Sequence, residues 1–133
     1  MSLAIQEVAE KIGLSIHTLR YYEDAGLIPS VNRADNGHRR YSDLDLRWLY
    51  FVRRLRATGM PTSEIRRYTS LALQGDSTLG ERLTLLEAHR DKVQLQIEEL
   101  TLCLNILEAK IAGYQALHSG LNGQGVPDCK PEQ

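Results

Sequence analysis

The sequence predicts a mainly α-helical protein with a small β-hairpin near its beginning and a long helix near its end. Three observations predict this architecture. Apolar residues recur at helical spacing in four short segments, residues 5–12, 16–22, 44–60 and 65–73. Asp35-Asn36-Gly37 is a tight-turn sequence between two short extended stretches. Between Leu79 and His118 apolar residues recur at alternating intervals of three and four except at Arg90, and this stretch contains no proline.

The first two predicted helices are short and lie on either side of a glycine. The first carries an apolar face of Ile5, Val8, Ala9 and Ile12. It stops at Gly13, the residue type that ends helices most readily. Ser15 can cap the second helix by accepting from its unpaired N–H groups. With Ile16, Leu19 and Tyr22 facing inward, the outward residues are His17, Thr18, Arg20 and Tyr21. This pattern is typical of a helix-turn-helix, and a helical hairpin with a solvated outer face is the alternative.

A two-stranded ribbon is predicted after this pair. Asn and Gly tolerate positive φ, so residues 31–33 and 38–41 can pair across the turn at Asn36-Gly37. The return strand reads His38-Arg39-Arg40-Tyr41. Arginine offers a forked cationic donor and tyrosine a hydroxyl on a rigid stem, which suits contact with phosphates and grooves. Beside a helix-turn-helix, such a ribbon is typical of a DNA-binding wing.

These motifs carry a family resemblance. LRYYEDAGLI at 19–28 followed by NGHRRY at 36–41 resembles the N-terminal domain of the mercury-resistance regulator (MerR) family of bacterial transcription regulators. The similarity runs from about Ile5 into the long C-terminal helix. It implies a winged helix-turn-helix that binds double-stranded promoter DNA and acts with RNA polymerase by bending and untwisting an over-long spacer. The family often has tyrosine after the wing glycine, where this chain has His38.

Two further helices are predicted over residues 42–75. Ser42 or Asp43 opens the first, and Gly59 separates it from the second, which Thr62 or Ser63 can cap. By resemblance this pair forms a second wing. We expect one or two of the arginines of the first helix to touch the DNA backbone, from the set Arg47, Arg53, Arg54 and Arg56.

The long helix is expected to need a partner. Thr78 and Glu81 have the spacing of a capping box at its start. Forty residues at 1.5 Å each make a helix of roughly 60 Å, whose apolar seam would be exposed to water unless another element packed against it. The seam residues assigned to dimerisation are Leu83, Leu86, Val93, Ile97, Leu100, Leu104, Leu107, Ile111 and Tyr114. A second copy is the simplest partner, and the resemblance implies an antiparallel coiled coil. A helix packed on its own domain is the alternative.

The charge of the chain differs between its two parts. Residues 1–75 hold 11 Lys and Arg against 8 Asp and Glu, whereas residues 76–133 hold 5 against 9. The basic part carries the DNA-reading motifs, as phosphate binding requires. We therefore expect a DNA-binding domain at 1–75, a dimerisation helix at 76–119 and a flexible tail at 120–133.

The expected DNA contacts follow from these motifs. A two-fold dimer would present two recognition helices and two wings to a palindromic site. We expect base-edge contacts from His17, Thr18 and Arg20, and phosphate contacts from Tyr21, Tyr22, Arg39, Arg40 and Tyr41. The interface also includes Ser15, Arg33, Asn36 and His38. A core role is an equal alternative for Tyr22. A coiled-coil scaffold without specific DNA readout is the alternative function.

Other functions find little support in the sequence. The four histidines are scattered, and no nucleophile, phosphate-loop or HExxH motif accompanies them, so we expect no enzyme and no cofactor. No metal site is expected either, although Cys129 and His118 are conceivable ligands. Cys103 flanks the seam and is interpreted as a buried small residue rather than a redox sensor. Lacking an apolar run of about 18 residues or a secretory start, the chain is expected to be cytoplasmic.

Overall fold

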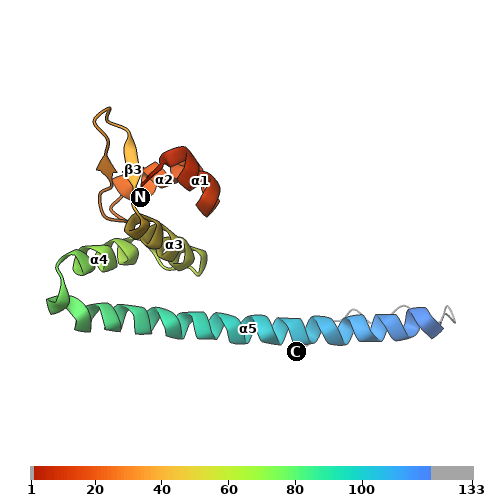
Figure 1. Ribbon diagram of the computed structural model, residues 1–133. Helices are drawn as coiled ribbons and strands as arrows, with labels where there is room; N and C mark the ends of the chain where they lie inside the picture. Colours follow the sequence, from red (N-terminus) through yellow and green to blue (C-terminus); the bar gives the residue numbers. More distant parts are fainter. Residues whose placement is uncertain (1, 121–133) are drawn as a thin grey trace. The chain divides into compact units, whose positions relative to one another are not determined.

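The computed structural model describes residues 2–120, which fall into two compact units that meet between Arg90 and Asp91 (Figure 1). The elements in chain order are β1 (Leu3–Ala4), α1 (Ile5–Ile12), α2 (Ile16–Asp24), β2 (Asn32–Arg33), β3 (Arg39–Tyr41), α3 (Asp43–Ala57), α4 (Thr62–Leu73), the 3-10 turn η1 (Asp76–Thr78) and α5 (Leu79–Gly120). The predicted fold class, mainly helical with a small hairpin and a long final helix, is confirmed.

The ends of the first helices follow from local chemistry. Gly13 closes α1 in the left-handed region at φ 81°, where its N–H donates to the Ala9 carbonyl at 2.9 Å. The Ser15 hydroxyl caps α2 by accepting from the Thr18 N–H at 3.0 Å, as predicted. At the start of α3, Ser42 and Asp45 form a reciprocal capping box. These caps begin and end the helices where the sequence indicated.

The wing is a three-stranded antiparallel sheet in the order β1-β3-β2. Asn32 and Arg33 of β2 pair with Arg40 and Arg39 of β3, which confirms the predicted hairpin with shorter strands. On its other edge β3 pairs with β1, in the register Leu3 to Tyr41. The sequence analysis did not predict β1, because a strand of only two residues has no periodicity to detect.

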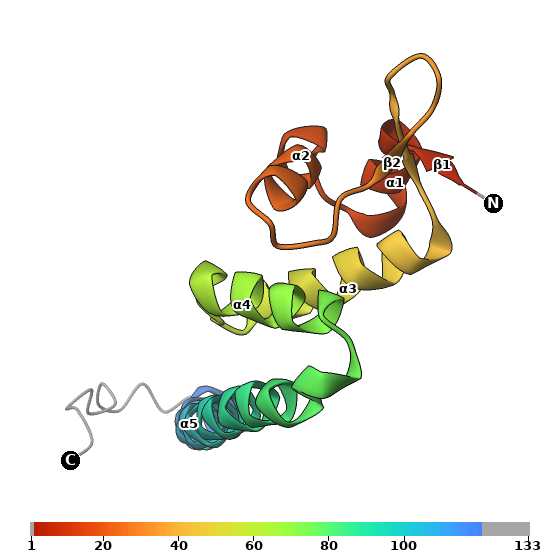
Figure 2. The same ribbon diagram turned by 90° about the vertical axis from the view of Figure 1, so that its left-hand side faces the viewer.

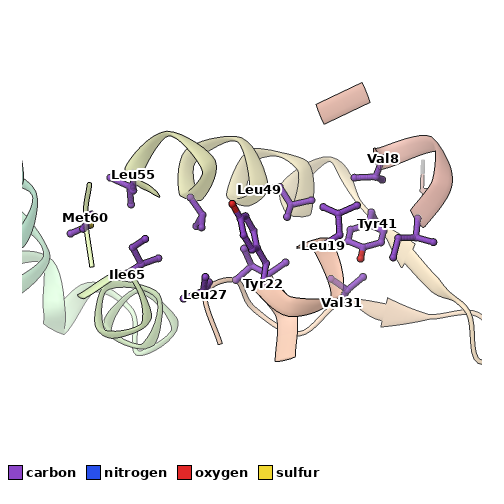
Figure 3. Packing of buried hydrophobic residues seen from close by; sticks show 13 residues of the cluster. Val8, Leu19, Tyr22, Leu27, Val31, Tyr41, Leu49, Leu55, Met60 and Ile65 are labelled. Atoms are coloured by element: carbon purple, nitrogen blue, oxygen red, sulfur yellow. The ribbon is translucent and has the colours of Figure 1, made fainter. Parts of the chain in front are cut away.

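One hydrophobic core joins the wing to the first three helices (Figure 3). Val8 of α1, Leu19 of α2, Tyr41 of β3 and Leu49 of α3 are all fully buried in it. The views in Figures 1 and 2 place α1, α2 and the hairpin on one side of α3. Burying each large apolar side chain stabilises the fold by about 1.5–3 kcal/mol, so this core holds α2 and the wing firmly against α3.

Two predicted caps are wrong. The residue before the first turn of α4 is Pro61, and no side chain caps this helix, so neither Thr62 nor Ser63 is its cap. Thr78 forms no capping box with Glu81. Its hydroxyl donates instead to the Leu71 carbonyl at 2.6 Å, while Glu81 accepts from Arg67 at 3.3 Å. Burial explains why Thr78 does not cap α5. Its side chain is only 3% exposed, and its hydroxyl is used as a donor to a carbonyl that precedes the helix.

α5 is one continuous helix of 42 residues, and Gly120, expected in the tail, is its last residue. Most of the predicted seam is exposed in the single chain, including Ile97, Leu100 and Leu104 at 55–69%. A second set of exposed apolar residues, Leu95 and Leu102 among them, lies on the opposite face of the helix. The rest of the predicted tail, residues 121–133, lies outside the described residues. No helix among the described residues is long and apolar enough to span a membrane.

Candidate nucleic-acid interface

The outer face of α2 presents the predicted reading residues to solvent. His17, Arg20 and Tyr21 are exposed, and Thr18 is half-buried. The Ser15 hydroxyl donates to the Thr18 hydroxyl at 2.9 Å, which orients both side chains at the beginning of the helix. Leu19 is buried behind this face, so the helix cannot turn its polar side away from solvent.

The wing places cationic side chains beside α2. Arg33 donates to the Gly37 carbonyl at 3.0 Å, and the Asn36 side chain accepts from the His38 N–H at 3.0 Å, which orders the turn. A pocket of about 370 Å³ opens between α1, α2 and the wing. The arginines that line it are Arg20, Arg33, Arg39 and Arg40, and His38 lies beside them. Residues from three separate segments therefore converge on a single positively charged hollow, as a phosphate backbone requires.

The two adjacent wing arginines differ in what they contact. The Arg39 Nε donates to Glu23 of α2 at 2.5 Å, and its side chain is only 13% exposed. Arg40 donates to the Ser2 hydroxyl at 3.2 Å and to the Ser2 carbonyl at 2.8 Å, which are neutral acceptors at the surface. The expected phosphate contact therefore fits Arg40, whereas the Arg39 guanidinium is engaged within the domain.

Two of the tyrosines expected at the interface lie in the core instead. Tyr22 is 3% exposed and Tyr41 is fully buried, so neither ring can reach DNA in this fold. Both belong to the cluster in Figure 3. Burial raises the pKa of Tyr41, and its hydroxyl has no hydrogen-bond partner among the described residues. Tyr22 thus has the core role given as its alternative, whereas the expected phosphate contact from Tyr41 is wrong, because inward packing of the aromatic ring outweighs the polar hydroxyl.

Side chains from α3 and α4 hold the ends of the helix-turn-helix. Arg53 donates to the Ile12 carbonyl at the end of α1, and Arg66 donates to the Ala25 carbonyl after α2 at 2.7 Å. The buried Thr69 donates to the Leu27 carbonyl at 2.7 Å. These donors satisfy carbonyls that helix ends and turns leave unpaired. Arg53, a candidate DNA contact in the sequence, therefore has a structural partner.

Sequence reasoning missed a buried polar contact between α3 and α5. His89 is 7% exposed, and its Nε2 lies 2.8 Å from the hydroxyl of Thr58, which caps α3. The Thr58 hydroxyl also donates to the Arg54 carbonyl at 3.0 Å. Which of the two groups donates depends on the tautomer of the His89 ring. His89 lies outside the predicted seam, and a single histidine on a helix gave no signal for this role.

Of the candidate metal and thiol residues, Cys103 and His118 lie among the described residues. Cys103 is exposed on α5 rather than buried, which corrects that expectation. No group of three or more potential ligands occurs within residues 2–120. Cys129, one of the two conceivable ligands, lies outside the described residues.

Two family models match the sequence of this fold. The one described as the MerR HTH family regulatory protein matches residues 3–71, and the one described as MerR, DNA binding, matches residues 46–109. The chain belongs to the MerR family. It is accordingly a DNA-binding transcriptional regulator, and the resemblance stated from LRYYEDAGLI and NGHRRY is confirmed.

Individual relatives agree with the MerR assignment. An uncharacterized HTH-type transcriptional regulator of Haemophilus influenzae is 44% identical over 115 residues, covering 86% of this chain and 85% of the relative. The crystal structure of HiNmlR, described as a MerR family regulator lacking the sensor domain and bound to promoter DNA, is 42% identical with a TM-score of 0.82. That match covers 90% of this chain and 94% of HiNmlR. A MerR family regulator of Bacillus thuringiensis is 32% identical with a TM-score of 0.78, covering 86% of this chain and 100% of the other.

Proposed function

We propose that this MerR-family regulator binds a palindromic promoter site as a homodimer and distorts the spacer DNA in response to an effector. The observation that carries the proposal is the cationic pocket shared by α2 and the wing, which gathers Arg20, Arg33 and Arg40. One such surface per chain suits one half-site, so two chains related by a two-fold axis suit a palindrome.

Within this proposal, the reading and positioning roles fall to different elements. The exposed residues of α2, His17 and Arg20, and the half-buried Thr18 supply base-edge contacts in the major groove. Phosphate contacts come from Tyr21, which is 41% exposed, and from the wing. The wing residues assigned to this role are Arg33, Asn36, His38 and Arg40.

Homodimerisation is proposed through α5, with DNA binding left to residues 1–75 and dimerisation to residues 76–119. The exposed seam supports this division, because Ile97, Leu100, Leu104, Leu107 and Ile111 are each at least 52% exposed in the single chain. A free seam of that length is unfavourable in water, and a second antiparallel copy would cover it.

Distortion of the spacer is the step that would link binding to transcription through RNA polymerase. HiNmlR, the relative solved on promoter DNA, supports placing this chain on a promoter. Contacts at two half-sites can offset the cost of bending, on the order of 1–6 kcal/mol for a site of about 20–30 base pairs.

The proposal is tested by DNA binding and by DNA shape. Arg20→Ala should weaken binding to the promoter duplex much more than to a random duplex, because a base contact is worth about 1–3 kcal/mol of discrimination. Arg40→Ala should weaken binding to both duplexes alike, and Lys92→Ala, which removes an exposed cation from α5, serves as the control. End-to-end energy transfer across the labelled promoter should rise on binding. Equal losses from Arg20→Ala on both duplexes, or an unchanged end-to-end distance, would contradict the assigned roles.

A further inference from the structure

Glu23 connects three segments of the DNA-binding domain. It lies in the last turn of α2, and its Oε2 accepts from the Val31 N–H at 2.8 Å. Its Oε1 accepts from the Nε of Arg39 in β3 at 2.5 Å. The side chains of Glu23 and Arg39 are only 10% and 13% exposed. One carboxylate thus ties the end of the recognition helix to the segment after it and to the wing.

Local charge sets Arg39 apart from its neighbour Arg40. Arg39 also lies 3.6 Å from the carboxylate of Asp24, so two acidic groups surround one guanidinium. Burial raises the pKa of Glu23, but the hydrogen bonds from Arg39 and Val31 outweigh it and lower the pKa overall. Glu23 is therefore charged at neutral pH and compensates Arg39. Arg40 donates to neutral oxygens of Ser2, so its charge stays available to an anion.

We propose that Glu23 is a positioning residue for DNA recognition, which holds the wing at a set place beside Arg20 and withholds Arg39 from the phosphates. The inference rests on the proposed function, in which α2 and the wing share one DNA backbone. Of the two arginines of β3, Arg40 is the one that contacts a phosphate. The Arg39 side chain acts only through Glu23.

The wing needs such a connection. Its strands have two, two and three residues, and sheets of this size are marginal without packing against another element. If the wing moved freely, the cost of ordering it would fall on DNA binding and reduce affinity for the specific site.

Salt dependence of DNA binding separates a phosphate contact from a positioning role. Each phosphate neutralised contributes about 0.9 to the slope of log affinity against log salt concentration, whereas a structural residue leaves the slope unchanged. The experiment compares the full-length wild type with Arg40→Ala, Arg39→Gln, Glu23→Gln and the double variant Glu23→Gln/Arg39→Gln. Specific and random duplexes are titrated at several salt concentrations, and thermal melting verifies that each variant is folded.

The expected changes in the steepness of this slope differ in sign. With two chains on one duplex, Arg40→Ala lowers the steepness by about 1.8, or about 0.9 per chain, whereas Arg39→Gln leaves it unchanged while preference for the specific duplex falls about tenfold. Glu23→Gln keeps an acceptor for Val31 but releases Arg39 in both chains, so the steepness rises by about 1.8 and preference for the specific duplex falls. The double variant loses that gain in slope.

Two results would overturn the inference. One is that Arg39→Gln lowers the slope as much as Arg40→Ala does. The other is that Glu23→Gln changes neither the slope nor the preference between duplexes. Failure of the proposed function has a different signature, because the wild type itself would then bind the specific and random duplexes with equal affinity.

Discussion

Replacement of Leu100 by aspartate should dissociate the proposed homodimer. Leu100 lies at the middle of the α5 seam and is 69% exposed in the single chain. Full burial of a leucine is worth about 1.5–3 kcal/mol, so covering this exposed part is worth about 1–2 kcal/mol per chain. Two symmetric copies bring the loss to about 2–4 kcal/mol, which raises the dimer dissociation constant about 30- to 1,000-fold. A buried carboxylate would add to that loss.

Leu102→Asp is the matched control. Leu102 is 61% exposed, two positions further along the same helix, and it points away from the seam. Both variants lose the same side chain and the same helix propensity. Sedimentation equilibrium over a range of concentrations, with circular dichroism for helix content, measures the result. Equal effects of Leu100→Asp and Leu102→Asp on the monomer fraction would refute the assignment of the seam.

Three further predictions concern the DNA-binding domain. Tyr41→Phe removes a buried hydroxyl that has no hydrogen-bond partner among the described residues. Chemical denaturation should therefore show unchanged or about 1 kcal/mol greater stability, and DNA affinity should not fall. A weaker complex with DNA would show that the Tyr41 hydroxyl does contribute to the interface. The lowered pKa of Glu23 gives stability that is present above its ordinary value of 4.5 and lost as the pH falls through the lowered value. The acid limb of the stability profile should therefore flatten in Glu23→Gln, and an unaltered limb would contradict the ion pair with Arg39. Gly13→Ala, at φ 81° and with Arg53 Nη1 3.2 Å from the added Cβ, should lose about 1–2 kcal/mol of unfolding free energy, and a melt equal to wild type would be inconsistent with that cap.

The local patterns of the sequence were sufficient for most of the architecture. Helical spacing of apolar residues, Gly13 and Ser15 located α1 and α2, and Asn36-Gly37 located the wing. These signals lie within a few residues of what they specify, so one sequence contains all of them. The apolar seam, interrupted only at Arg90, likewise predicted α5 as a single long helix.

The sequence could not resolve contacts between residues far apart in the chain. The sequence alone does not distinguish the roles of the neighbouring arginines Arg39 and Arg40. Only the fold brings Glu23, 16 positions earlier in the chain, into contact with Arg39. Tyr41 alternates with Arg40 along a strand, yet the strand's orientation on the core decides which of the two is buried. A two-residue strand such as β1 is defined only by its partner.

The central claim, two chains on one duplex, is tested most directly by the stoichiometry of the complex. The promoter duplex that co-purifies with the cross-linked protein would be fluorescently labelled and sedimented with increasing amounts of the full chain. The account predicts two chains per palindromic duplex, with steep release as salt is raised. Saturation at one chain per duplex, or no binding to any duplex at low ionic strength, would contradict it.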